Sequence, residues 1–188
     1  LLAYLKKKKI NLIEDVCESH GAFHKKRKCG SLGLMSNFSY YYAHHMTTIE
    51  GGMISTNDKN IYDLARMFRG HGLVRELENS NLKNNIINNN KNLNPEFIFQ
   101  VPGFNFRNNE IGGYLGRKQL KKLDQNIVKR NINHNLFLEL LDKNIYRTNF
   151  YLSGASNYAF NIVLQNKYKN KVSKLMQLMN KNGIEFRR

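Results

Sequence analysis

The first hundred residues alternate between short apolar runs and polar turns that contain glycine, a pattern typical of an α/β fold. The apolar runs predict strands at 10–14, 38–42 and 53–56, and amphipathic stretches predict helices at 1–9 and 58–69. Asn57 or Asp58 is the expected cap of the second helix. Its predicted buried face consists of Ile61, Leu64, Ala65 and Phe68. Between these elements we expect a basic, glycine-punctuated loop at 20–34 and a shorter loop at 43–49.

The pattern of the second half is different. Residues 79–94 are rich in asparagine, which predicts a surface loop, and residues 97–107 are expected to be extended. Beyond them the sequence predicts helices at 109–122 and 125–142, a strand at 158–164, a helix at 170–182 and a further strand from Ile184 to Phe186. The order changes from α/β to α+β around 109–125, so we place a domain boundary there, with parts 1–108 and 109–188.

Composition narrows the class of protein. The chain has 188 residues and 30 Lys and Arg against 14 Asp and Glu, which gives a formal charge of +16. Such a charge raises nucleic acid or an anionic membrane as partners. No basic motif interleaved with aromatic residues occurs, however, and lysine and asparagine are enriched together along the whole chain. We therefore interpret the charge as solvated surface positions and predict neither a nucleic-acid nor a membrane partner.

The apolar runs and the cysteines exclude two further classes. No apolar run approaches the roughly 18 residues that a membrane-spanning helix requires. The two cysteines, Cys17 and Cys29, are too few for a disulfide framework or a four-thiolate metal site. A reducing, cytoplasmic setting is the simplest interpretation.

Candidate chemistry is concentrated in a few polar residues. Asp15 ends a predicted strand with Glu18 three residues further on, Ser39 lies inside the predicted strand 38–42, and His44 and His45 lie in the loop after it. Asn105 and Arg107 belong to the segment Gly103–Arg107. Open α/β sheets place functional groups after such strands. Each residue alone also has an ordinary structural explanation. The adjacent histidines point in opposite directions in an extended chain and lack further ligands at zinc spacing, so no metal site is predicted.

The order of the motifs is more specific than any one of them. It comprises Asn11–Ala22, Gly30–Gly33, Phe38-Ser39, Glu50–Met53, Arg69–Arg75, Gly103–Ile111 and Leu115–Leu123. This series resembles the DegT/StrS-type sugar aminotransferases over nearly the whole chain. The resemblance implies an aspartate-aminotransferase-like fold (fold type I), with the end of the large cofactor-binding domain at 1–108 and linking helices plus part of the small domain at 109–188. It also implies missing segments on both sides, so we expect a fragment that is inactive alone.

The resemblance further implies a site for pyridoxal or pyridoxamine phosphate. Asp15 matches the carboxylate that faces the pyridine nitrogen and keeps it protonated. Glu18 matches a position near the ring, and Ser39 matches a hydroxyl that contacts the cofactor phosphate. Asn105 matches a residue that reaches the phosphate in the neighbouring subunit, which implies a homodimer. His45 and Arg107 are weaker candidates for substrate contacts.

One departure from the family pattern bears on the reaction. Alignment of the flanking motifs puts His44 where the family carries its Schiff-base lysine, and no lysine occurs between Lys28 and Lys59. Imidazole cannot form a Schiff base, but it can transfer protons near neutral pH. The same replacement occurs in the pyridoxamine-phosphate-dependent 3-dehydratases of nucleotide sugars, in particular those acting on GDP-4-keto-6-deoxymannose. There glutamate regenerates the cofactor.

These observations predict C3 dehydration of a 4-keto-6-deoxy nucleotide sugar with His44 as acid and base. A sugar aminotransferase and a catalytically degenerate partner subunit remain open as alternatives, and a nucleic-acid binder ranks last. A related dehydratase of CDP-linked sugars uses an iron–sulfur cluster, which needs about four thiolates. Two cysteines do not provide them, so we predict no cluster.

Overall fold

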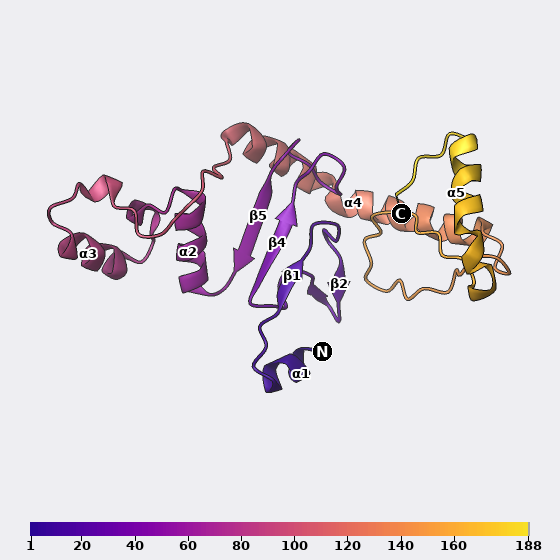
Figure 1. Ribbon diagram of the computed structural model, residues 1–188, viewed down its shortest axis with the longest axis horizontal. Helices are drawn as coiled ribbons and strands as arrows, with labels where there is room; N and C mark the ends of the chain where they lie inside the picture. Colours follow the sequence, from indigo (N-terminus) through magenta and orange to yellow (C-terminus); the bar gives the residue numbers. More distant parts are fainter. Residues whose placement is uncertain (188) are drawn as a thin grey trace.

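The computed structural model describes residues 1–187, and its centre is a three-stranded sheet (Figure 1). The strand order is β1 (Ile13–Asp15), β4 (Met35–Ser39) and β5 (Gly52–Thr56). β1 and β4 are parallel, with Asp15 opposite Asn37, and β4 and β5 are antiparallel. The predicted α/β arrangement is present, although β4 begins and ends three residues earlier than expected.

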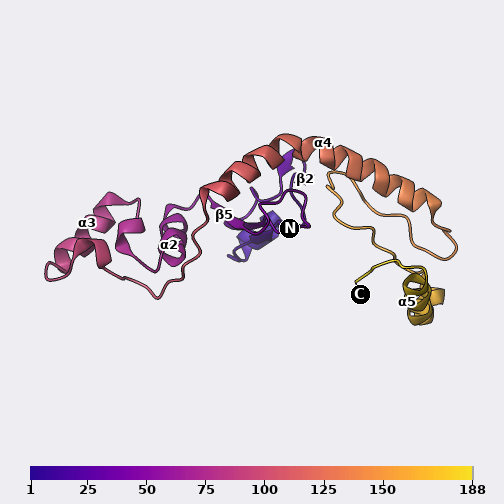
Figure 2. The ribbon, with the colours of Figure 1, turned by 90° about the horizontal axis from the view of Figure 1, so that it is seen from above.

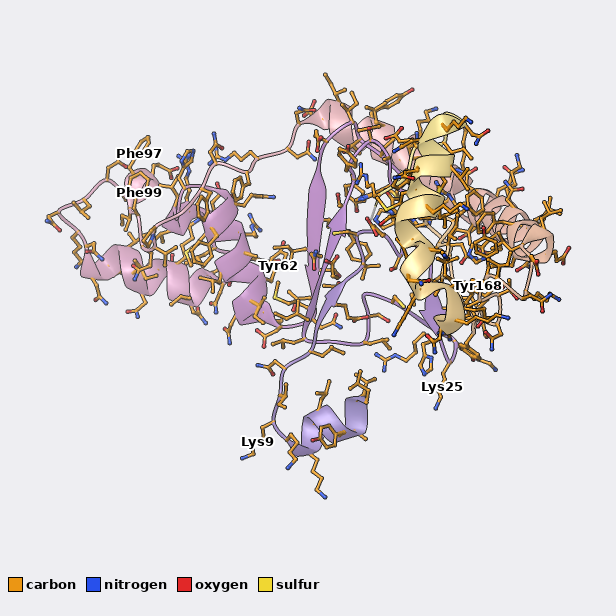
Figure 3. The ribbon with its side chains drawn as sticks, turned by 45° about the vertical axis from the view of Figure 1, so that its right-hand side comes forward. Lys9, Lys25, Tyr62, Phe97, Phe99 and Tyr168 are labelled. Atoms are coloured by element: carbon orange, nitrogen blue, oxygen red, sulfur yellow. The ribbon has the colours of Figure 1, made fainter. Side chains whose placement is uncertain are left out.

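A short hairpin interrupts the loop between β1 and β4. β2 (Phe23–His24) pairs with β3 (Arg27–Lys28), and Lys25 and Lys26 at the turn both have positive φ. Two residues in this conformation match the type I′ turn, whose twist suits adjacent strands. Lys25 lies at the edge of the molecule in Figure 3. The hairpin is bonded to the C-terminal half, because the N–H of Phe23 donates to the carbonyl of Gly154 at 2.9 Å.

Helix α2 (Lys59–Arg69) follows β5 and begins as predicted, since the Asp58 side chain accepts from the N–H groups of Asn60 and Ile61. The buried face differs from the expected one. Asp63 and Met67 are buried, whereas Leu64 and Phe68 are 41% and 38% exposed. Asp63 is buried because its carboxylate accepts N–H bonds from the chain at 78–79.

The side of α2 away from the sheet packs on a small lobe. This lobe contains η1 (Val74–Glu76), α3 (Ser80–Asn89) and η2 (Pro95–Phe97). Its apolar core consists of Met67, Val74, Leu77 and Ile98, with Ile86, Ile87 and Val101 against it. Phe97 and Phe99 project from the lobe and are 59% and 62% exposed (Figure 3).

The asparagine-rich segment was wrongly predicted to be a loop. It forms α3, because Asn79 caps the N–H of Leu82 at 3.1 Å, and Ile86 and Ile87 pack on the core of the lobe. The high asparagine content of residues 79–94 favoured the prediction of a loop, although Ile86 and Ile87 give the segment a short apolar face.

The two helices expected between 109 and 142 are a single helix, α4 (Glu110–Leu140). No proline or glycine follows Gly116 within it, so nothing terminates the helix near Asp124. In Figure 2 α4 runs along one side of the sheet and continues to the C-terminal segment. The predicted domain boundary near 108 is not tested by this continuity and stays a prediction.

The C-terminal segment contains fewer strands than expected. The helix predicted at 170–182 is present as α5 (Val172–Lys181), and η3 (Asn166–Lys171) precedes it. The strand predicted at 158–164 is only one antiparallel bridge, between Tyr146 and Leu164. No strand forms at 184–186 within the described residues, because the N–H of Ile184 closes α5 by donating to Met179. The N-terminal helix is α1 (Leu2–Lys7), close to expectation.

Candidate cofactor and catalytic site

Asp15 stands at the carboxyl end of β1, the position at which parallel strands present functional groups. Its Oδ1 accepts from the Cys17 N–H at 3.1 Å and from Asn37 Nδ2 at 3.2 Å. Hydrogen bonds from the thiol and the N–H of Cys17, with smaller contributions from Asn37 and the charge of His44, lower the pKa of Asp15. The carboxylate is therefore ionised at neutral pH and remains exposed to a ligand.

Glu14, the residue before Asp15, binds backbone N–H groups of the loop before β4 and is not available to a ligand in the same way. Its carboxylate accepts N–H bonds from Gly30, Leu32 and Gly33 at 2.6–2.7 Å. Partial burial acts to raise the pKa of Glu14, but these three donors and Arg27 outweigh it and lower the pKa. Glu14 thus ties β1 to the loop that leads into β4, and so holds the two strand ends in register.

The loop after β4 presents His44. The His44 Nδ1 lies 3.2 Å from the carbonyl oxygen of Ser39, the last residue of β4. A carbonyl only accepts, so this contact assigns the proton to Nδ1 and leaves the lone pair on Nε2. The Ser39 hydroxyl in turn accepts from the N–H of Tyr41 at 3.3 Å. His44 is half-buried, and its orientation suits a group that accepts a proton at Nε2.

The end of the same loop holds a strained residue. Ile49 has φ +73°, a region that β-branched residues rarely adopt. Such a conformation costs on the order of 1–3 kcal/mol and persists only where neighbouring contacts hold it. Here Thr47 Oγ1 accepts from the Ile49 N–H at 2.9 Å.

Two buried histidines lie behind His44. His20 is 2% exposed, its ring centroid lies 6.4 Å from that of His44 and 5.8 Å from that of His45, and neither of its ring nitrogens has a partner within residues 1–187. Burial, then the nearby His45 and His44, lowers the pKa of His20 to about 4. His45 is 4% exposed, and its Nε2 lies 3.1 Å from the carbonyl oxygen of Ser156. Burial also lowers the pKa of His45.

Asp15, Ser39 and His44 therefore lie together, as the sequence predicted, at one end of the sheet. Glu18 is exposed on the turn after Asp15. Asn105 and Arg107 lie elsewhere: Asn105 bridges to Gly70, and Arg107 Nη2 donates to Glu76 Oε1 at 3.2 Å. Within this chain those two residues belong to the α2 side of the sheet.

Sequence reasoning missed three neighbours of the site. Asn37 orients Asp15, His20 packs behind His44, and the Tyr158 ring lies 5.5 Å from the His44 ring. His20 could have been noticed because it belongs to the motif Asn11–Ala22. Tyr158 carries no local signal, since only the fold brings it near His44. Among residues 1–187 no cluster of three His, Cys, Asp or Glu side chains could hold a metal ion.

An acidic residue at the end of a parallel strand, a neighbouring hydroxyl and a reactive side chain on the next loop are the arrangement of a pyridoxal-phosphate-type aminotransferase fold. A model of the DegT/DnrJ/EryC1/StrS aminotransferase family matches residues 1–188, and the chain belongs to this family. The resemblance inferred from the motifs is confirmed.

Curated relatives include two classes of enzyme. A GDP-4-keto-6-deoxy-D-mannose 3-dehydratase from Escherichia coli is 35% identical over 95% of this chain and 46% of the relative. A UDP-4-amino-4,6-dideoxy-N-acetyl-beta-L-altrosamine transaminase from Campylobacter jejuni is 31% identical over 75% of this chain and 33% of the relative. The chain thus spans less than half the length of these relatives.

A solved structure confirms the fold class. The E. coli GDP-4-keto-6-deoxy-D-mannose-3-dehydratase with bound hydrated PLP matches 97% of this chain and 47% of that protein, with 30% identity and a TM-score of 0.82. No helix among residues 1–187 is long and apolar enough to cross a membrane.

Proposed function

We propose that this chain carries the catalytic loop of a pyridoxamine-phosphate-dependent 3-dehydratase that acts on a 4-keto-6-deoxy nucleotide sugar. The observation that carries the proposal is His44. It occupies the loop after β4 in place of a lysine, its Nδ1 is held by the Ser39 carbonyl, and no lysine occurs from 29 to 58. Similarity to the GDP-4-keto-6-deoxymannose enzymes supports the choice of substrate class.

The residues present suit the cofactor. Pyridoxamine phosphate, when bound, supplies a primary amine for the 4-keto group and a ring that accepts electrons. Asp15 is ionised and exposed, as a partner for a protonated ring nitrogen must be. We assign Ser39 to the cofactor phosphate and Glu18 to the edge of the ring.

His44 would move the proton. With the cofactor and substrate bound, Nε2 of His44 would accept a proton and would give it to the departing C3 hydroxyl, which would leave as water. The Ser39 carbonyl accepts from Nδ1, so Nε2 is the ring nitrogen available for proton transfer.

The partners are part of the same proposal. We assign Asn105 to the cofactor phosphate of a second subunit in a homodimer, since it lies on the α2 side of the sheet and not beside Asp15. Glutamate is the proposed amino donor, and Arg107 and His45 are assigned to the substrate side. Because Cys17 and Cys29 are both free thiols, we place the protein in the reducing cytoplasm.

Product analysis tests the reaction. Full-length protein with pyridoxamine phosphate and GDP-4-keto-6-deoxymannose should release the 3-deoxy product, and His44→Asn should lower kcat by about 10²–10⁴-fold, the usual contribution of a general acid–base. His24→Asn is the matched control, because His24 is exposed on the β2–β3 hairpin. A 4-amino sugar as the product would favour the aminotransferase alternative.

Borohydride trapping tests the missing lysine separately. With pyridoxal phosphate the wild-type protein should give no adduct on a lysine, whereas His44→Lys should give one. An adduct on a lysine of the wild-type protein would contradict the proposal that His44 replaces the Schiff-base lysine.

A further inference from the structure

A pocket lies behind the catalytic loop, between α4 and the segment 157–160. Its volume is about 380 Å³, within the usual range for small-molecule sites. Its lining comprises His45, Asn126, Lys129, Arg130, Asn133, His134 and 157–160. His45 and Tyr158 also lie beside His44, whereas the residues of α4 in this lining have no role in the proposed reaction.

The α4 side of this pocket is a polar stripe at the spacing that normally buries apolar side chains. The stripe consists of Asn126, Lys129, Arg130, Asn133 and His134. These positions follow the i, i+3, i+4, i+7, i+8 pattern of one helix face. Because α4 turns amides and cations toward the segment 157–160, the space between them is lined by polar groups and not by an apolar core.

The charged side chains that line the pocket are all positive. Lys129 and Arg130 line it, and no Asp or Glu does. Arg130 Nη1 donates to the carbonyl of Tyr158 at 3.1 Å, which leaves its other guanidinium groups without a partner in the part of the chain described. The positive charge of Arg130 also contributes to the lowered pKa of His45, after burial, which is the main cause.

Two buried histidines line the same pocket. His134 is 6% exposed and His45 is 4% exposed, and the Nδ1 atom of each lacks a hydrogen-bond partner within residues 1–187. Buried polar atoms are rarely left unpaired. A bound oxyanion could accept a hydrogen bond from such a ring N–H and so provide the missing partner.

The fold holds the opposite wall of the pocket firmly. Asn157 Nδ2 donates to Asn131 Oδ1 at 2.8 Å, and Asn131 Nδ2 donates to the carbonyl of Ala155 at 3.2 Å. Asn157 has φ +45°, a conformation that asparagine tolerates, and its hydrogen bond to α4 helps to fix this turn. The wall is therefore preformed, as a binding site requires.

We propose that this pocket binds a phosphate-type oxyanion through Lys129, Arg130 and His134. The anion is either free inorganic phosphate or the phosphate of a nucleotide. The proposal concerns binding and not sugar turnover, although His45, which is assigned to the substrate side of the reaction, also lines this pocket.

Phosphate titration tests the site. Full-length protein is first saturated with pyridoxamine phosphate, so that the cofactor's own phosphate site is filled. Inorganic phosphate is then added while calorimetry gives the Kd and NMR follows the histidine ring resonances. We expect saturable shifts at His134 and His45, and none at the exposed His24.

Variants on α4 distinguish specific binding of phosphate in the pocket from nonspecific attraction of phosphate to the positively charged chain. Lys129→Glu should weaken phosphate about tenfold or more, the worth of one charged hydrogen bond. Lys129→Ala should weaken it less. Lys122→Ala is the matched control, because Lys122 is exposed on the same helix outside the pocket, and it should leave the Kd unchanged.

A second arm uses GDP in place of phosphate. If GDP binds more tightly than phosphate and is also weakened by Lys129→Glu, the source is a nucleotide; if only phosphate depends on Lys129, the source is the free anion. An equal Kd for the wild type and Lys129→Glu, or the same loss for Lys122→Ala, overturns the proposal. Because neither readout requires sugar turnover, inactive protein that still binds phosphate would refute the proposed function alone.

Discussion

At the scale of single residues, three histidines occupy one region with different environments. The ring of His44 is held at Nδ1 by a carbonyl and is half-buried. His20 is buried without a partner for either nitrogen in the described chain, and His45 is bonded at one nitrogen only. Burial favours the neutral forms of His20 and His45 at neutral pH, because it lowers the pKa of each.

His20 makes stability depend on pH. Its folded pKa of about 4 lies below its ordinary value of 6.5, so the unfolded chain binds the proton first. The contribution of His20 to the free energy of unfolding should be fully present above pH 6.5. As the pH drops from 6.5 toward 4, the free energy of unfolding should fall by up to about 3 kcal/mol because of this group. Urea unfolding of full-length protein at several pH values measures the slope.

His20→Phe keeps an aromatic ring beside Phe38 but removes the titration, so it should flatten this slope. His24→Phe, on the exposed hairpin, should leave the slope as it is. If the wild type and His20→Phe lose stability in parallel between pH 6.5 and 4, another group is responsible.

At the scale of elements, α3 shows how a cap and two isoleucines can organise an asparagine-rich segment. Its sequence is mostly polar, and none of its residues is fully buried. Its stability therefore rests on the Asn79 cap and on the contacts of Ile86 and Ile87 with the lobe core. A short isolated helix of this kind would be marginal in water.

Removal of the cap tests this account. Asn79→Ala should lower the free energy of unfolding by about 1 kcal/mol, the usual value of an N-cap side chain. Asn84→Ala is the control: Asn84 is exposed inside α3, and alanine is the better helix former there, so this variant should be neutral or slightly stabilising. Equal losses in the two variants, measured by urea unfolding, would contradict the cap.

At the scale of the whole molecule, the charge is far from balanced. The chain carries a formal charge of +16, and only three salt bridges occur in the described residues, all between arginine and glutamate. Most lysines are therefore solvated and repel one another, which disfavours the compact state at low salt.

Salt should therefore stabilise the protein. Raising sodium chloride from about 20 to 200 mM shortens the screening length severalfold and should raise Tm by a few degrees. A variant with Lys6–Lys9 changed to glutamine should show a smaller rise. Scanning calorimetry measures both, and a Tm that falls with sodium chloride would refute the repulsion argument.

The sequence by itself determined the elements whose signals are local. Asp58 capped α2, the apolar run before Asp15 formed β1, and the motif order placed the chain in its family. The sequence put Asp15 at the end of one predicted strand and His44 in the loop after the next, and the pairing of β1 with β4 in the structure brings them together with Ser39.

Only the tertiary structure decided the features that depend on distant partners. The strand expected at 158–164 lacked a neighbouring ladder, and Leu64 and Phe68 faced solvent while Asp63 was buried by backbone donors from 78–79. Tyr158 and the polar stripe of α4 carry no local functional signal in the sequence. Only the tertiary structure brings Tyr158 beside His44 and the stripe beside His45. Local pattern specifies an element's period, but packing selects which face is buried and which side chains meet.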